Sequence, residues 1–285
     1  MIVTKLRIIA LHKIFSTFVM TTLLGCATGR GINEGQLNIY STLQDKHIGK
    51  YYASLVMQTY QPLYDYEINA YIDNLGQKLV RVSTDPLFEY QFRILKMKEF
   101  NAFTVGGGYV YVTTGLVERL PHEAGLASVI AHETGHNLAR HITEGLTKRN
   151  LLGIATSAIG GGVAAEAIDL FGSLGLLQYG RENELEADKL GLELAFKANY
   201  KLSGFKDTFL IIQKLYENQA TLPLINDLLA THPKPKARIE QIEELTPQYK
   251  EKPDAILTTQ NFEKTKQRIK TYLEEEKKNQ NNKTP

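Results

Sequence analysis

The sequence has no tryptophan, a single cysteine (Cys26) and almost no net charge. One cysteine excludes an intrachain disulfide and any zinc site built from several thiolates. Lys and Arg number 33 against 31 Asp and Glu, so the basic excess of a nucleic-acid-binding domain is missing, and no nucleic-acid partner is expected. The 285 residues are 43% hydrophobic and 22% charged, which excludes pervasive disorder and a protein with many membrane spans. The chain is long enough to bury a sizeable core.

A long hydrophobic run is also missing at the amino terminus. The uncharged, mostly apolar stretch there covers only residues 14–24, whereas a membrane-spanning helix needs about 20 apolar residues. It follows three basic side chains, Lys5, Arg7 and Lys13, and no acidic one. This arrangement is typical of a secretory signal peptide, which we place at residues 1–25. Its removal would leave a nearly neutral chain.

Cys26 comes directly after this leader. Residues 23–26 (Leu-Leu-Gly-Cys) resemble the cleavage box of bacterial lipoproteins, in which the cysteine thiol is lipidated and the chain is cut before it. Cys26 is therefore the expected lipidation site, and residues 26–35 form the lipidated tether. By the same resemblance, Ala27 favours sorting to the outer membrane. We expect an outer-membrane lipoprotein that faces the periplasm and is held to the membrane by its N-terminal lipid.

The rest of the chain predicts a mainly helical α+β domain with a small β-sheet at residues 36–246. The spacing of apolar residues predicts helices at 51–60, 66–82, 115–120, 122–148, 183–198, 206–216 and 237–245. Alternating residues predict a strand at 88–95, and two extended segments flank the glycines at 106–108. Residues 247–285 are predicted to be a charged helical extension, with its helix at 262–278 and a disordered end.

Residues 151–177 are rich in glycine and alanine. Glu166 and Asp169 near the middle would be costly in a membrane-spanning helix, and the glycines at 160–162 would weaken any helix. We interpret the segment as a flexible lid or a packed helical hairpin beside the site. Insertion into a membrane, as in an integral-membrane protease, is the alternative.

Residues 132–136 read His-Glu-Thr-Gly-His, an HExxH motif within a predicted helix. Positions i and i+4 share one helical face, so the imidazoles of His132 and His136 can both bind one zinc ion. Glu133, next to the first ligand, can take the proton of the water that attacks a peptide carbonyl. The motif therefore predicts one Zn²⁺ per chain and a hydrolase.

A catalytic zinc needs a third protein ligand. The metzincin pattern fails, because Ala139 and Ile142 occupy the positions where that class has a glycine and its third histidine. A later helix offers Glu184 and Asp188, four residues apart on one face. Glu184 would complete a site of two imidazoles and one carboxylate, and Asp188 would accept a hydrogen bond from a ligand imidazole. Glu186, on another face, is the rival third ligand.

These segments together resemble the zinc metallopeptidase family of the type I CAAX prenyl protease and the heat-shock protease HtpX (metallopeptidase family forty-eight), over residues 66–245. The similar positions are Asn101-Ala102-Phe103, Gly106 to Gly108, Gly115-Leu116, the HETGH motif, the ExxADxxG pattern from Glu184 to Gly191, and Thr231-His232-Pro233 with Arg238. The periplasmic branch, whose members act on outer-membrane proteins, is the most similar part of the family. The resemblance implies a gluzincin-like domain and supports Glu184 over Glu186 as the third ligand.

The resemblance also implies roles for His232 and Arg238. In the family, the histidine of the His-Pro motif lies near the metal. There His232 would either bind the developing oxyanion or act as a removable extra zinc ligand that keeps the enzyme latent. Arg238, one turn into the next helix, would hold this loop through a carboxylate contact. His141 is interpreted as structural, or as a partner of a ligand.

Substrate binding is expected along the edge strand of the sheet, where it flanks the zinc cleft. An extended peptide can pair with such a strand through backbone hydrogen bonds, and glycines allow a close approach. The expected substrate-binding residues are Asn101, Ala102, Phe103, Gly106 and Gly107. Such binding suits unfolded or misassembled envelope polypeptides and predicts weak sequence specificity. An ordinary hairpin is the alternative interpretation.

The sequence thus predicts a zinc endopeptidase, lipid-anchored in the bacterial envelope, that degrades misfolded or misassembled outer-membrane and periplasmic proteins. The alternative is a periplasmic chaperone or assembly factor that binds extended chains at its edge strand, with proteolysis latent or secondary. Glu133 argues for the enzyme, since a structural metal site needs no such base. Larger periplasmic members of the family carry helical repeats after the protease domain. None is visible after residue 245, so a partnership with the outer-membrane assembly machinery has no docking domain to support it.

Overall fold

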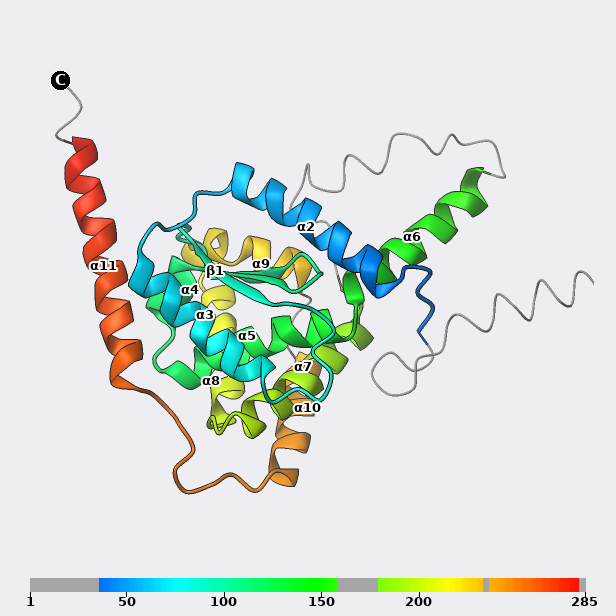
Figure 1. The fold of residues 1–285 in the computed structure, drawn as a ribbon. Coiled ribbons are helices and arrows are strands. Elements are labelled where there is room, and N and C mark those ends of the chain that lie inside the picture. Colours follow the sequence, from blue (N-terminus) through cyan, green and yellow to red (C-terminus); the bar gives the residue numbers. More distant parts are fainter. Residues whose placement is uncertain (1–35, 158–178, 233–235, 282–285) are drawn as a thin grey trace, which may run out of the picture.

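The computed structural model describes residues 36–157, 179–232 and 236–281 (Figure 1). Cys26, the leader, the tether and residues 158–177 of the predicted lid lie outside this part of the chain. The described residues are mainly helical and include one small three-stranded sheet, which confirms the predicted fold class. None of the helices described is both long and apolar enough to span a bilayer.

The helices follow the predicted order along the chain. They are α2 Thr42–Thr59, α3 Tyr66–Val80, α4 Thr114–Arg119, α5 Glu123–Leu138, α6 His141–Ser157, α7 Arg181–Lys197, α8 Ser203–Glu217, α9 Asn226–Thr231, α10 Lys236–Leu245 and α11 Gln260–Asn281. Two short 3₁₀ helices cover Gln219–Leu224 and Thr246–Gln248. Helix α2 begins well before residue 51, because a reciprocal capping box between Ser41 and Gln44 starts it. Helix α9 was not predicted.

The sheet has the strand order β1–β3–β2, with β1 Gln91–Leu95, β2 Ala102–Thr104 and β3 Tyr109–Thr113. Strand β1 is parallel to β3, and β2 pairs antiparallel with β3 at the edge. Between β2 and β3 the chain turns at three glycines with positive φ values of 80°, 60° and 92°, a region that other residues rarely adopt. The predicted pair of extended segments around a glycine corner is confirmed.

Helix α5 is the centre of the domain (Figure 1). It contacts α7 and α8 most extensively, and it also contacts α3 and β2. Its first turn is capped by His122, whose Nδ1 accepts a hydrogen bond from the backbone N–H of Gly125 at 3.1 Å. Nearly every residue of α5 is buried, so the HExxH motif lies in the interior and not on a surface helix.

The single helix predicted at 122–148 is wrong, because the chain breaks between α5 and α6. Arg140 has a φ of 55°, in the left-handed region that ends an α-helix. Its side chain is held by tertiary contacts, since Nε donates to Oδ2 of Asp45 at 2.5 Å and Nη2 donates to the carbonyl oxygen of Tyr40. The sequence pattern contains no glycine or proline there, so the break depends on residues far away in the chain.

The C-terminal helix α11 packs on α3 and α4 along one side of the molecule (Figure 1). Its Phe262 and Ile269 are fully buried and belong to the main hydrophobic core. Most of its charged residues are exposed, and Arg268 pairs with Asp65 and Glu67. The helix of the predicted extension is therefore anchored to the rest of the fold by its first half.

Candidate metal centre

His132 and His136 lie one turn apart on the buried helix α5. Their Nε2 atoms are 3.0 Å from each other and face a common point. Two nitrogens bound to one tetrahedral zinc at about 2.0–2.1 Å would be roughly 3.3 Å apart. Burial is the main cause that lowers the pKa of both imidazoles. Both are therefore neutral near pH 7, which is the form that binds a metal.

Two glycines allow α7 to approach α5 closely. A Cβ atom on Gly135 would lie 2.7 Å from the backbone oxygen of Ala187, and one on Gly191 would lie 2.9 Å from the backbone nitrogen of His132. Real Cβ atoms essentially never come so close to backbone. The approach brings Glu184, in the first turn of α7, to the imidazoles. Its Oε1 is 3.3 Å from Nε2 of His136.

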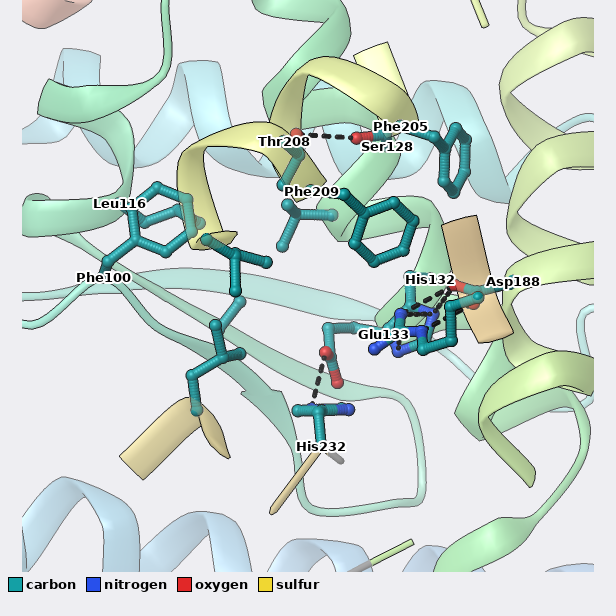
Figure 2. Close-up of a pocket in the computed structure, with 15 residues that line it drawn as sticks. Phe100, Leu116, Ser128, His132, Glu133, Asp188, Phe205, Thr208, Phe209 and His232 are labelled. Atoms are coloured by element: carbon teal, nitrogen blue, oxygen red, sulfur yellow. Dashed lines mark hydrogen bonds and ion pairs between the residues drawn. The ribbon is translucent and has the colours of Figure 1, made fainter. Parts of the chain in front are cut away.

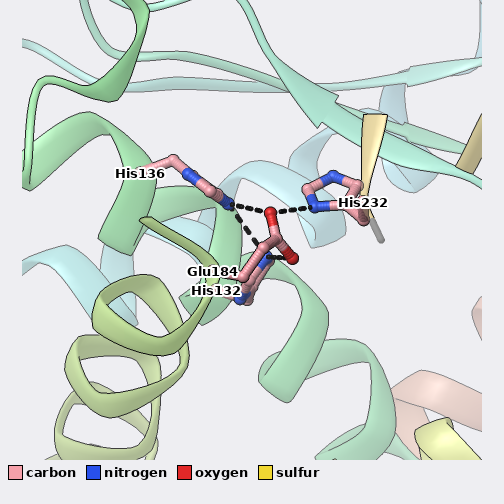
Figure 3. Close-up of side chains that lie close together, drawn as sticks. All are labelled: His132, His136, Glu184 and His232. Atoms are coloured by element: carbon pink, nitrogen blue, oxygen red, sulfur yellow. Dashed lines mark hydrogen bonds and ion pairs between the residues drawn. The ribbon is translucent and has the colours of Figure 1, made fainter. Parts of the chain in front are cut away.

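Four side chains converge at this point (Figure 3). His132, His136, Glu184 and His232 each offer one ligand atom, these atoms all lie within 4.8 Å of one another, and all four residues are buried. His232 follows the last turn of α9, and its Nδ1 is 2.8 Å from Oε1 of Glu184. Imidazole nitrogens and a carboxylate oxygen form a donor set that suits zinc. Three separate elements thus bring the sequence-predicted ligands together.

Glu133 directs its carboxylate toward the same point. Its Oε1 lies 3.4 Å from Nε2 of His232 (Figure 2). Oε2 of Glu133 and Nε2 of His232 are buried with no hydrogen-bond partner among the described residues. Buried polar atoms without a hydrogen bond lower the stability of the fold, so these two atoms fit a site that binds a metal ion together with water or substrate. Burial raises the pKa of Glu133 to about 7, which suits a group that accepts and releases a proton near neutral pH.

The buried charges at the centre influence one another. Burial alone would raise the pKa of Glu184, but His232 and Arg238 hold it well below its usual range, so this carboxylate is ionised. Burial alone would lower the pKa of His232, but Glu184 and Glu133 raise it. Glu184 and His232 therefore each favour the charged form of the other.

Asp188 and Arg238 hold His132 in place. Nε and Nη2 of Arg238 donate to the two oxygens of Asp188 at 2.6 and 2.7 Å, and Nη1 lies 2.6 Å from Oε2 of Glu184. Nδ1 of His132 lies 2.8 Å from Oδ1 of Asp188. When Nδ1 carries the proton and donates it to Asp188, Nε2 of His132 is left free to bind a metal.

His136 has different neighbours. Its Nδ1 is 2.8 Å from Nδ1 of His141, and the Tyr179 ring stacks on it with ring centroids 3.8 Å apart. Glu186, the rival ligand, directs Oε2 to Nε2 of His141 at 3.2 Å and lies outside the ligand cluster. Tyr179 was not predicted. It carries no motif, and its backbone N–H is positioned by the carbonyl oxygen of Thr231, far away in the chain.

Two of the expected substrate-binding residues, Asn101 and Ala102, are buried at the start of the edge strand. Ala102 lines the same cavity as Glu133. The backbone of Thr104, two residues along β2, lies against the Glu133 carboxylate and favours its ionised form. Asn101 is buried, and its Oδ1 has no hydrogen-bond partner among the described residues. The edge strand therefore flanks the candidate base.

The other three expected substrate-binding residues are absent from the lining of that cavity, although Gly106 and Gly107 line a smaller one together with His136. Phe103 stacks on Tyr111, with centroids 5.3 Å apart, in a small apolar cluster beneath α2. Gly106 and Gly107 pack against α2, because a Cβ atom on Gly49 would lie 2.5 Å from the carbonyl oxygen of Gly106. The structure thus places these two glycines at a helix contact, and they do not line the cavity next to Glu133.

That cavity is largely apolar (Figure 2). Its apolar lining consists of Phe100, Ala102, Leu116, Val129, Phe205, Phe209, Ile212 and Leu228. The metal-centre side chains lie at one end, and a hydrogen-bonded pair, Ser128 and Thr208, lies at the other. The cavity can receive an apolar side chain next to a carbonyl group that reacts at the centre.

Comparisons with known proteins agree with this geometry. Residues 67–246 match the model of a family described as peptidase family M48. A putative beta-barrel assembly-enhancing protease of Vibrio cholerae is 31% identical over 219 residues, which cover 72% of this chain and 45% of that protein.

Two further relatives are more distant. The mitochondrial metalloendopeptidase OMA1 of Schizosaccharomyces pombe is 27% identical over 211 residues, or 71% of this chain and 59% of the relative. The beta-barrel assembly-enhancing protease of Escherichia coli K12 is 28% identical over 209 residues, or 69% and 42%. The chain spans about half the length of these curated relatives.

Proposed function

Because the chain belongs to peptidase family M48 and is therefore a metallopeptidase, we propose that its metal is one zinc ion held by His132, His136 and Glu184, and that it cleaves peptide bonds within polypeptides. The observation that carries the proposal is the position of Glu133. Its buried carboxylate reaches the ligand cluster with one oxygen unpaired among the described residues. A metal site with only a structural role needs no such group.

In this proposal each side chain has a defined task. Zinc, when bound, supplies a Lewis acid that polarises the substrate carbonyl and makes water a better nucleophile. Glu133 takes a proton from the attacking water and delivers it to the leaving amine, for which a pKa of about 7 is well suited. Asp188 and Arg238 fix the orientation of His132. The edge strand β2 holds an extended substrate by backbone hydrogen bonds.

His232 has two candidate roles, and both use its Nε2, which has no hydrogen-bond partner among the described residues and lies 3.4 Å from Oε1 of Glu133. As a hydrogen-bond donor it stabilises the negative charge that develops on the substrate oxygen. Its place in the four-residue ligand cluster instead supports a removable fourth ligand that keeps the enzyme latent. A His232→Ala variant separates the two roles. Cleavage falls by roughly 100-fold if the residue stabilises the oxyanion, and rises if it blocks the open coordination position.

The proposal also covers the location of the protein in the cell and the class of its substrates. We propose a lipid anchor at Cys26, a position at the periplasmic face of the outer membrane, and misfolded or misassembled envelope polypeptides as substrates. The relatives named beta-barrel assembly-enhancing proteases support an envelope substrate. Incorporation of labelled fatty acid into the full chain, and its loss in a Cys26→Ser variant, tests the anchor. A chain that incorporates label without Cys26 contradicts it.

The test of the catalytic proposal uses the full chain extracted in detergent. Metal analysis should give one zinc per chain, and casein should be cleaved until a chelator is added. Glu133→Gln should keep the zinc and lose at least 100-fold in cleavage rate. Glu118→Gln, an exposed glutamate on α4, is the matched control and should cleave like the parent. Cleavage by Glu133→Gln at the parental rate would overturn the proposal.

A further inference from the structure

A continuous hydrogen-bonded chain leads from the metal centre to the first described residues of the protein. We infer that His141, Glu186 and Gln36 form a positioning chain for the metal ligand His136, an inference that rests on the proposed function. None of the three lies in the ligand cluster. Each acts through the next, so that the N-terminal segment helps to set the orientation of a zinc ligand 100 residues away.

The distances define the chain. Nδ1 of His136 is 2.8 Å from Nδ1 of His141, and Nε2 of His141 is 3.2 Å from Oε2 of Glu186. The side-chain amide of Gln36 donates to the same Oε2 at 2.6 Å. His136 and His141 are buried, and the Glu186 side chain is 29% exposed. The chain therefore runs from the interior to the rim of the domain.

Only one arrangement of protons satisfies all of these contacts. If His136 binds a metal through Nε2, its Nδ1 must carry the proton and donate it to His141. Nδ1 of His141 is then the acceptor, so its proton lies on Nε2 and is donated to Glu186. The carboxylate closes the chain because it only accepts. A metal ligand whose second nitrogen is fixed in this way keeps its tautomer and ring orientation.

The turn between α5 and α6 makes this chain possible. In an uninterrupted helix, positions 136 and 141 would be about 140° apart around the axis, and the two rings could not meet. The left-handed Arg140 redirects the chain and returns His141 to His136. Residues 36–45 hold the turn, since Asp45 and the carbonyl of Tyr40 accept from Arg140. Nδ2 of Asn38 also donates to Oγ1 of Thr143, in the first turn of α6.

The two imidazole ligands thus have different supports. His132 contacts a carboxylate directly, and Arg238 fixes that carboxylate. His136 reaches its carboxylate through a second histidine. This explains why Glu186 has an acidic side chain in the ExxAD segment although it is directed away from the ligand cluster.

The experiment measures metal affinity in the full chain, by competition with a chromophoric chelator. Glu186→Leu removes the acceptor of His141 and should weaken zinc binding by 10- to 100-fold. Glu186→Gln keeps an amide oxygen at the same place and should restore most of that loss. Glu193→Leu removes an acid of the same helix whose side chain is 43% exposed and forms a salt bridge with Lys197, and it is the matched control, with parental affinity expected. Gln36→Leu should weaken binding several-fold, because it acts one step further out.

A second measurement separates positioning from general destabilisation. The visible absorption of Co²⁺ bound in place of zinc reports ligand geometry. We expect it to change in Glu186→Leu and to remain parental in Glu193→Leu and Glu186→Gln. Parental zinc affinity and a parental Co²⁺ spectrum in both Glu186→Leu and Gln36→Leu would overturn the inference. If instead the parent itself binds no zinc, or His136→Ala binds as tightly as the parent, the proposed zinc site fails and not only the positioning chain.

Discussion

Arg238 allows the sharpest test of the structure. Its guanidinium is buried and contacts three carboxylate oxygens, two on Asp188 and one on Glu184, at 2.6 to 2.7 Å. Arg238→Met keeps a similar volume and removes the charge. Asp188 and Glu184 are then left as buried carboxylates without their cationic partner. Breaking a buried ion pair from one side costs about 3–5 kcal/mol of unfolding free energy.

The assay is thermal and urea unfolding of the metal-free protein at neutral pH, followed by circular dichroism. For a domain of this size, such a loss corresponds to a decrease in Tm on the order of 10 °C. Arg238→Lys should fall between the parent and Arg238→Met, because lysine keeps the charge and loses the planar fork that reaches both carboxylates.

A surface arginine gives the matched control. Arg268 is 47% exposed and pairs with Asp65 and Glu67, so Arg268→Met should cost no more than about 1 kcal/mol. A loss below about 1 kcal/mol for Arg238→Met as well would refute the buried pairing described above. A loss of several kcal/mol in both variants would show that the unfolding free energy responds to arginine removal in general.

Three further changes have defined outcomes. Burial raises the pKa of Glu133 from its ordinary 4.5 to about 7, so the free-energy penalty of ionising it in the folded state grows between about pH 4.5 and 7 and is fully present above 7. Glu133→Gln should therefore stabilise the metal-free protein at pH 8 by up to about 3 kcal/mol in urea unfolding and by much less at pH 5, and equal effects at both pH values would contradict the shift. Gly135→Ala should push α7 away and weaken zinc binding at least 10-fold in chelator competition, whereas Gly125→Ala, whose Cβ would meet only side chains, should not. Phe209→Ala enlarges the apolar cavity, so the ratio of kcat/KM for peptides with larger apolar side chains to that for peptides with smaller ones should rise roughly 10-fold. An unchanged ratio across a peptide series would exclude the cavity as a substrate pocket.

The parts of the site that could be predicted are those set by local spacing. His132 and His136 share a face because they are four residues apart on one helix, and the same spacing pairs Glu184 with Asp188. These relations depend only on the helix that carries the residues, and not on its tertiary contacts. The break at Arg140 does not follow from local spacing, since no helix-breaking residue marks it and its left-handed backbone is held by residues 40 and 45.

The contacts of His136 could not be predicted from the sequence for the same reason: they depend on tertiary contacts and not on local spacing. Tyr179 stacks on the ring, and its backbone N–H donates to the carbonyl oxygen of Thr231, a contact between segments far apart in the chain. Glu186 lies in the predicted helix, yet its use depends on where the break at Arg140 places His141. Long-range hydrogen bonds of this kind leave no periodic signal in a sequence.

The charges at the centre explain why a dication suits it. Arg238 contacts both Asp188 and Glu184, and His232 contacts both Glu184 and Glu133, so three buried acids share two cationic groups. The pKa directions reflect this arrangement: burial is the main cause that raises the pKa of Glu133, and the two acids Glu184 and Glu133 raise the pKa of His232. A divalent cation bound by Glu184 would take over the role of His232 in balancing this charge. His232 would then be free to contact the substrate, and the role of Glu133 would be to accept and release the proton of the reaction.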